Sequence, residues 1–137
     1  MINFNYETNF RLTNEAAIVS WIEEVIKKEA HVLGDVSYIF CDDNYLLNLN
    51  ITYLDHDTLT DIISFDTTEG SCVNGDIFIS IERVKENAKI FNVSFQEELH
   101  RVMIHGILHY LGYNDKLEEE QSEMTRMEEE SLLLLKV

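Results

Sequence analysis

The sequence predicts an α+β fold in which a small mixed sheet of three to four strands packs with about five helices. Segments rich in β-branched and aromatic residues are confined to the first 80 residues, and the chain beyond them shows only helical apolar spacing. No proline, low-complexity tract or linker interrupts the 137 residues. We therefore expect one domain, residues 1–137, built on a single core.

At the start of the chain, residues 2–6 alternate apolar and Asn side chains, which predicts a half-buried strand. Asn14 is the expected N-cap of a helix whose apolar residues recur at the i, i+3 and i+4 spacing. We expect this helix to end between His31 and Gly34, because glycine readily ends helices. Residues 36–41 are rich in β-branched and aromatic side chains and predict a second strand.

The middle of the chain supplies further short elements. Asp42 or Asp43 is expected to cap a helix that runs to about Tyr53, and a polar turn follows it. The other expected elements are a strand at 62–65, a polar loop at 66–74 and a strand at 76–80. A loop of this length allows the last two strands to pair in antiparallel fashion.

Three helices are expected to complete the fold. The first covers residues 81–91, and the last is amphipathic and covers about 117–135. Between them, Ser94 and Glu97 match the S-x-x-E capping box that opens a helix. That helix should be largely buried and should end at Gly112, because glycine readily adopts the left-handed conformation.

The most informative stretch, residues 105–115, lies in this buried helix and just beyond it. His105 and His109 are four residues apart, so both imidazoles project from one helix face. Asp115 follows the helix-ending glycine and can return beside them. Two imidazole nitrogens and one carboxylate oxygen with an open fourth position are typical of a catalytic zinc site. We therefore expect these three residues to bind one Zn²⁺ or another divalent metal ion, although paired histidines also occur in cores and on surfaces without a metal.

Gly106 occupies the position at which the H-E-x-x-H motif of metalloproteases carries its general base. The spacing therefore argues against a peptidase of that class. A glycine within a helix costs roughly 1 kcal/mol relative to alanine. We expect that cost to reflect a close approach to the metal at Gly106, either by backbone or by substrate.

Composition restricts the classes of function. The formal net charge of −16 argues against a non-specific nucleic-acid binder, because phosphate binding needs Lys and Arg. It is compatible with a nucleic-acid enzyme that has a local basic cleft. The acidic residues between 118 and 130 are expected to form a solvated helix face, and a docking surface for a basic protein is the alternative. Arg83, Lys85 and Lys89 are similarly open to phosphate contact or to an ordinary solvated helix.

The sequence also indicates a cytoplasmic protein. No apolar run reaches the ~20 residues that cross a bilayer, so we expect no membrane partner. The first residues lack the basic and apolar regions of a signal peptide. Two cysteines make no disulfide framework, and we expect Cys41 in the core and Cys72 in a loop.

Residues 105–115, HGILHYLGYND, resemble the H-G-x-L-H-L-x-G-Y-D-H signature of the YbeY family of rRNA maturation factors. The family block T-D-V-L-S-F stands here as TDIISF at residues 60–65, and residues 75–77 match its G-D-I block. An upstream family segment is matched, in the same order, by Leu49, Asn50 and Tyr53. The resemblance implies a metal-dependent, single-strand endoribonuclease that acts in rRNA maturation and in ribosome assembly or quality control.

The sequence departs from the family pattern in two places. Asp115 stands where the family has its third histidine ligand, and Asn114 precedes it in place of an aspartate. A carboxylate oxygen remains a good zinc ligand, but its negative charge makes a bound water less acidic than a third histidine would. Leu54 stands where the family usually has an arginine.

Two residues are candidates for the substrate site. Arg101 lies one helical turn before His105 and could replace the missing arginine, and pairing with Glu97 or Glu98 is the alternative. His56, in the acidic turn after the second helix, is a candidate cleft residue, although a loop histidine is often merely exposed. The sequence identifies no general base.

The resemblance also implies partners, namely rRNA as the substrate and the ribosomal small subunit or its proteins as the docking site. Two other functions stay open. One is a metal-dependent hydrolase of peptides or other esters, and the other is a non-enzymatic ribosome-assembly factor whose metal is structural.

Overall fold

Four strands form one mixed sheet in the order β1-β2-β4-β3. A computed structural model describes residues 1–56 and 58–135. Strand β2 (Val32–Cys41) is parallel to both β1 (Ile2–Tyr6) and β4 (Cys72–Ser80), whereas β3 (Ile62–Asp66) runs antiparallel to β4. The predicted mixed sheet and the antiparallel pairing of its last two strands are confirmed.

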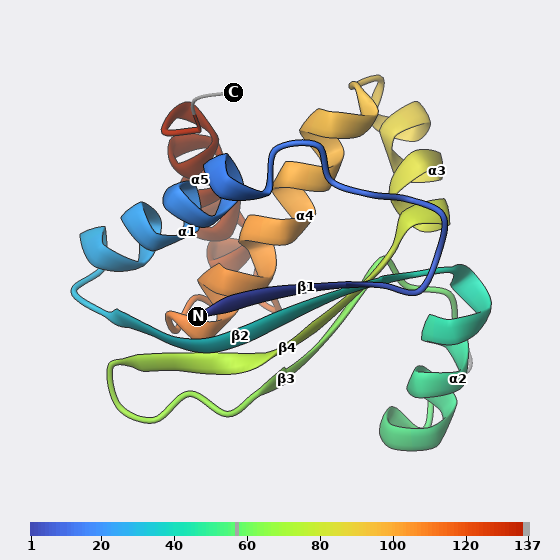
Figure 1. The fold of residues 1–137 in the computed structure, drawn as a ribbon, viewed down its shortest axis with the longest axis horizontal. Coiled ribbons are helices and arrows are strands. Elements are labelled where there is room, and N and C mark those ends of the chain that lie inside the picture. Colours follow the sequence, from blue (N-terminus) through green and yellow to red (C-terminus); the bar gives the residue numbers. More distant parts are fainter. Residues whose placement is uncertain (57, 136–137) are drawn as a thin grey trace.

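Five helices lie around this sheet in the described part of the chain. They are α1 (Glu15–Lys28), α2 (Asp43–Leu54), α3 (Ile81–Phe91), α4 (Phe95–Tyr110) and α5 (Glu118–Leu133). Helices α1, α4 and α5 gather on one face of the sheet, α3 lies beside the start of α4, and α2 lies on the opposite side (Figure 1). This arrangement confirms the predicted α+β class. None of the described helices combines the length and apolar character needed to span a membrane.

The main hydrophobic core lies between the sheet and helices α1, α4 and α5. Two buried polar contacts fix these layers to one another. The Trp21 indole N–H donates to the Ser131 carbonyl oxygen at 2.6 Å, which joins α1 to α5, and the Tyr38 hydroxyl donates to the Met103 carbonyl oxygen at 2.8 Å, which joins β2 to α4. A smaller cluster under α2 holds Leu46 against Ile63 and Cys41 on the other face of the sheet. Strand side chains alternate between these two clusters, as the pleat of a sheet requires.

Local side-chain capping explains where two helices begin. The Asp42 carboxylate accepts from the Tyr45 backbone N–H at 2.8 Å, so Asp42, rather than the following aspartate, caps α2. The Ser94 hydroxyl accepts from the Glu97 backbone N–H at 3.1 Å and opens α4. Each bond satisfies one of the N–H groups that the first turn of a helix leaves without a partner.

The first helix ends earlier than the sequence predicts. Helix α1 ends at Lys28, and Ala30 makes the reversal with a positive φ of 58°. Gly34 lies inside β2 and does not end the helix, so the expected stop between residues 31 and 34 is wrong. A side chain at Gly34 would run into the side chain of Asn74 on β4, which is why glycine stands there.

The predicted loop 66–74 is also partly wrong, because β4 already begins at Cys72. Cys72 is therefore a strand residue that pairs with Val32 of β2. The sequence did not reveal the first residues of this strand, because the polar side chains of Asn74 and Asp76 interrupt the pattern of β-branched residues. Cys41 is fully buried, as predicted.

Gly75 allows α4 to approach the sheet closely at its carboxyl end. A Cβ at Gly75 would lie 2.6 Å from the Phe65 carbonyl oxygen and 2.6 Å from the Tyr110 hydroxyl oxygen. The Tyr110 hydroxyl uses this space to donate to the Asp76 carbonyl oxygen at 2.9 Å. The close approach of α4 to the sheet therefore explains the glycine of the G-D-I block.

Gly75→Ala is expected to destabilise the fold by about 2–3 kcal/mol, because one of the two atoms its Cβ would strike belongs to the backbone and cannot rotate away. Urea unfolding of the two proteins measures the difference. Gly70→Ala is the control, since its Cβ meets nothing within 4 Å and the substitution carries only the left-handed backbone cost of about 1–2 kcal/mol. A smaller loss at Gly75 than at Gly70 would contradict the packing argument.

Candidate metal centre

Helix α4 presents two histidines one turn apart, and the structure brings Asp115 beside them. The Nε2 atoms of His105 and His109 are 3.0 Å apart. The Asp115 Oδ2 atom lies 3.2 Å from the first and 3.3 Å from the second. These three atoms form a group that can hold one metal ion.

A tight turn after α4 returns Asp115 to the histidines. Gly112 has φ of 104°, in the region that side chains disfavour, and a Cβ there would meet nothing. The backbone N–H groups of Gly112 and Tyr113 donate to the His109 and Leu108 carbonyl oxygens, both at 3.0 Å. The Tyr113 hydroxyl then donates to the Glu29 carboxylate at 3.1 Å, which fixes the turn to the end of α1. The expected helix end at glycine is confirmed.

The spacing and chemistry of the three atoms fit a tetrahedral cation. Zinc–nitrogen and zinc–oxygen distances of about 2.0–2.1 Å place tetrahedral ligands roughly 3.3 Å apart. The triangle of His105, His109 and Asp115 has edges of 3.0, 3.2 and 3.3 Å. The three side chains are 22%, 30% and 38% exposed, so the group is partly open to solvent. This exposure would leave room for the fourth ligand of a catalytic site.

Glu128 of α5 fixes the tautomer of His105. The His105 Nδ1–H donates to Glu128 Oε2 at 2.7 Å, so its Nε2 carries the lone pair that faces the triangle. Burial lowers the pKa of His105, but the hydrogen bond and charge of Glu128 outweigh burial and raise it. A carboxylate behind a ligating histidine is the usual support of a metal site.

Sequence reasoning missed Glu128 by placing it on the solvated acidic face of the last helix. The structure leaves it only 8% exposed, so that expectation is wrong for this residue. A signal was present: Met124, Met127 and Ser131 are also buried, and together with Glu128 they follow helical spacing. Exposed acids do cover the rest of α5, for example Glu119 and Glu123.

Arg101 does not pair with a carboxylate of its own helix. Its guanidinium pairs with Glu128 at 3.0 Å and with Glu129 at 2.6 Å, both on α5. The expected alternative, a bond to Glu97 or Glu98, is therefore wrong. The pair compensates the charge of the buried Glu128 carboxylate, which accepts the His105 proton. Arg101 also lines a cavity together with His105, and its place in a substrate site stays a prediction.

His56 is exposed and does not join the metal group. Its backbone N–H donates to the Asn50 carbonyl oxygen at 3.1 Å, which closes the end of α2. Within residues 1–56 and 58–135, its ring makes no hydrogen bond or ion pair. The geometry therefore gives His56 no contact with the candidate centre.

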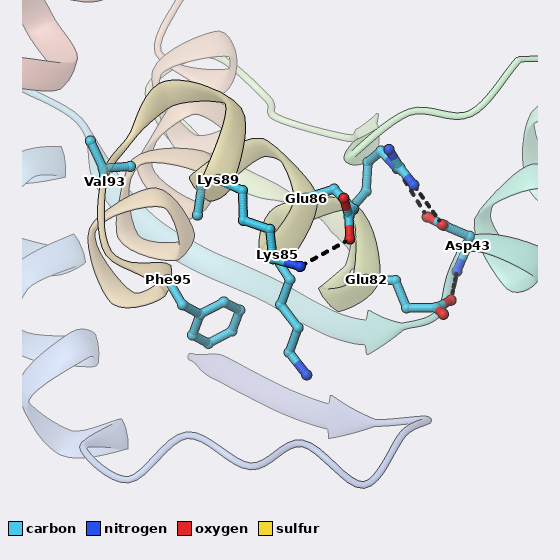
Figure 2. A pocket seen from close by; sticks show the side chains of 9 residues that line it. Asp43, Glu82, Lys85, Glu86, Lys89, Val93 and Phe95 are labelled. Atoms are coloured by element: carbon cyan, nitrogen blue, oxygen red, sulfur yellow. Dashed lines mark hydrogen bonds and ion pairs between the residues drawn. The ribbon is translucent and has the colours of Figure 1, made fainter.

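The basic residues of α3 line a groove of about 810 Å³ that is balanced in charge. Figure 2 shows its acidic and basic side chains facing one another. Arg83 pairs with Asp43 at 3.0 Å, and Lys89 pairs with Glu86 at 3.5 Å. The Lys85 Nζ atom lies 6.0 Å from the centroid of the Phe95 ring. Three bases and three acids line the groove, so it presents no excess positive charge to a phosphate backbone.

Gly106 faces the sheet rather than the metal group. A Cβ there would lie 3.0 Å from Ile77 Cδ1 and 3.2 Å from Ile62 Cδ1. The expectation that glycine lets backbone or substrate approach the metal is therefore wrong. Its role is to let α4 pack closely on β3 and β4, and this packing also excludes a general base of the metalloprotease type from that position.

A second feature missed from the sequence is a cavity of about 210 Å³ on the other side of His105. Besides Arg101 and Glu128, its polar lining includes Asp61, from the turn before β3, and Glu98 of α4. Burial raises the pKa of Glu98 to about 7, with help from the charge of Asp61. Burial also raises the pKa of Asp61. Thr60 and Asp61, which begin the TDIISF block, are the feature of the sequence that could have pointed to this cavity.

Fold and site together define a class: small α+β proteins whose central helix carries two histidines completed by a carboxylate. The family model described as "Endoribonuclease YbeY" matches residues 3–136. The chain belongs to the YbeY family.

Relatives and a solved structure agree with this assignment. The chain is 56% identical over 137 residues to "Endoribonuclease YbeY" of Flavobacterium johnsoniae, covering 100% of this chain and 99% of the relative. It is 46% identical over 136 residues to the protein of the same name in Karelsulcia muelleri, covering 99% and 96%. The solution structure of TM1509 from Thermotoga maritima is 30% identical, with a TM-score of 0.74 over 98% of this chain and 89% of that one.

Glu128→Gln is expected to weaken zinc binding by about 10–100-fold, because an amide cannot hold the His105 proton as a carboxylate does. Competition with a zinc chelator at pH 7.5 measures the affinity. Glu129→Gln is the matched control, because Glu129 also pairs with Arg101 but does not contact His105. Equal losses in the two variants would show that Glu128 acts only through Arg101.

The raised pKa of Glu98 predicts that the metal-free protein loses stability as pH rises. Below about pH 4.5 the carboxyl is protonated in both the folded and unfolded chains, and between 4.5 and about 7 only the unfolded chain releases the proton. The loss reaches about 3 kcal/mol above pH 7. Denaturant unfolding at pH 4 and pH 8 measures this loss. Relative to the parent protein, Glu98→Gln is therefore expected to have a higher free energy of unfolding at pH 8 than at pH 4. A constant difference between them would contradict the shift.

Proposed function

We propose that this chain is a zinc-dependent endoribonuclease that cleaves single-stranded RNA in the cytoplasm, in rRNA maturation and in ribosome assembly or quality control. His105, His109 and Asp115 would hold one zinc ion within the single domain. The observation that supports this most directly is the triangle of ligand atoms with edges of 3.0–3.3 Å, supported by Glu128, in a member of the YbeY family.

The residues of the chain prepare the centre for phosphodiester hydrolysis. Glu128 holds the Nδ1 proton of His105 and so leaves Nε2 free to bind, while Arg101 pairs with Glu128. Asp115 contributes a negative charge that offsets part of the cation's charge. A divalent cation, when bound, polarises a phosphoryl oxygen and lowers the pKa of a water. The exposed side of the triangle gives an RNA strand room to approach.

The ribosomal small subunit or one of its proteins is the partner we propose for docking. The exposed acidic side of α5 supports a basic protein partner, because opposite charge steers association. Five glutamates on this side are exposed, namely Glu118, Glu119, Glu123, Glu129 and Glu130.

A metal-stabilised assembly factor without nuclease activity is the second candidate function. One observation favours it: Leu54, where the family usually has arginine, is 46% exposed at the end of α2 and supplies no charge. A peptidase is disfavoured, because Gly106 packs on the sheet at the position where a metalloprotease has its base.

Zinc-loaded protein is expected to cleave an unstructured RNA oligonucleotide, and His109→Ala is expected to lose at least 100-fold in zinc affinity and to reduce cleavage to background. Gel analysis of labelled RNA and elemental analysis of the purified proteins give the two readouts. His56→Ala is the matched control, since it removes an exposed histidine outside the group.

Asp115→His tests the departure from the family pattern. A third imidazole is expected to retain zinc and to speed cleavage, because a neutral ligand leaves more positive charge on the cation. Zinc binding without RNA cleavage in every protein would favour the assembly factor. Equal zinc content in the parent protein and His109→Ala would remove the proposed centre.

A further inference from the structure

Glu98 is a largely buried residue whose carboxyl group faces a cavity. The residue is 4% exposed, and it lines the cavity of about 210 Å³ beside His105. Its side chain makes no hydrogen bond or ion pair with any residue in the described ranges. Its neighbour Glu97, by contrast, is exposed on the same helix. An ionised carboxylate in such a place is unfavourable unless something compensates its charge.

The groups that face Glu98 do not supply that compensation. Arg101, its nearest cation on α4, already pairs with Glu128 and Glu129 of α5. Asp61, on the sheet side of the cavity, is itself a carboxyl group, and it accepts a long hydrogen bond of 3.4 Å from the Asn87 side chain.

The carboxyls of Asp61, Glu97 and Glu128 each disfavour a charge on Glu98, and Arg101 only partly opposes them. His105 completes the titratable lining of the cavity. Two carboxyl groups that face one small cavity do not readily ionise together, so the pair of Asp61 and Glu98 tends to retain a proton.

His105 lines the cavity and also contributes Nε2 to the metal group, so the cavity borders the candidate centre at this residue. Five of the seven lining residues are polar or charged, and a water needs only about 10–15 Å³ of accessible volume and two or more polar partners. A volume of about 210 Å³ therefore has room for several waters between Glu98 and His105.

We propose that Glu98 accepts the proton of the attacking water in the reaction, through water in this cavity, and returns it to the leaving oxygen. The inference rests on the proposed RNA hydrolysis. As the water oxygen bonds to phosphorus, its O–H bond breaks and the proton passes to the carboxylate. As the bond from phosphorus to the leaving oxygen breaks, that oxygen takes the proton back. The products are a phosphomonoester and an alcohol, and Glu98 is unchanged.

Proton transfer of this kind is most efficient when the carrier's pKa lies near the working pH. The pKa of Glu98 is raised to about 7 in the metal-free protein. A divalent cation in the nearby triangle lowers it, because positive charge favours the carboxylate. The metal-loaded protein should therefore begin to cleave RNA at a lower pH than this value alone suggests.

The test compares Glu98→Gln with the parent protein, both saturated with zinc, in single-turnover cleavage of an RNA oligonucleotide between pH 5.5 and 8.5. We expect the variant to be at least about 100-fold slower and to lose the acid limb of the pH profile. Its RNA and zinc affinities are expected to change less than twofold. Glu97→Gln is the matched control and should keep both the rate and the profile.

A second measurement is independent of turnover. Carbon-13 NMR of the glutamate side-chain carboxyls should show one signal that titrates near pH 7 without metal. That signal should be present in Glu97→Gln and absent in Glu98→Gln, and zinc should move its midpoint to lower pH. If the amide variant does not fold, Glu98→Asp takes its place, and it should keep the acid limb at a reduced rate.

Three results would overturn the proposal. The first is a Glu98→Gln rate within twofold of the parent with the same acid limb. The second is a Glu98 signal that titrates at the ordinary value for glutamate. The third is the absence of RNA cleavage by the parent protein at every pH, which removes the proposed function and the role of Glu98 with it, whereas the first two leave the nuclease function intact.

Discussion

The close packing of α4 on the sheet is the constraint on which the rest of the structure depends. It is possible because Gly106 has no side chain where Ile77 and Ile62 lie, and because Gly75 leaves room for the Tyr110 ring. Gly106 follows His105 directly in the sequence. The face of α4 that packs on the sheet is therefore adjacent to the face that carries the two histidines. The depth at which α4 sits therefore also sets the position of both imidazoles.

Around α4, charge is arranged in two zones with different chemistry. On one side, His105, His109 and Asp115 bring lone pairs together and favour a cation. On the other side, Asp61 and Glu98 face a small cavity in which a proton is favoured instead. His105 borders both zones, with Nε2 in the triangle and its ring at the cavity. Arg101 pairs with Glu128, the carboxylate that accepts the His105 proton, so one cation compensates part of the negative charge near both zones.

The sequence predicted what local rules control, and missed what distant segments decide. Apolar periodicity located the helices, and the HGILHYLG stretch with its glycine predicted both the histidine face and the return of Asp115. The strand order could not be read in this way, because β4 lies between β2 and β3 through non-local pairing. Arg101 and Glu128 were misassigned for the same reason, since their partners lie 27 and 23 residues away along the chain. Gly106 was misread because its neighbours are on the sheet.

The contact between α5 and His105 has a consequence for chains that lack the carboxyl-terminal helix. Both histidines and Asp115 precede residue 128, so a chain without α5 carries the three candidate ligands but not Glu128. Until α5 docks, His105 lacks the group that selects its tautomer, and the indole of Trp21 lacks its partner at Ser131. In the proposed centre, full affinity for a metal would therefore require α5, so a carboxyl-terminally clipped chain would compete poorly for the ion.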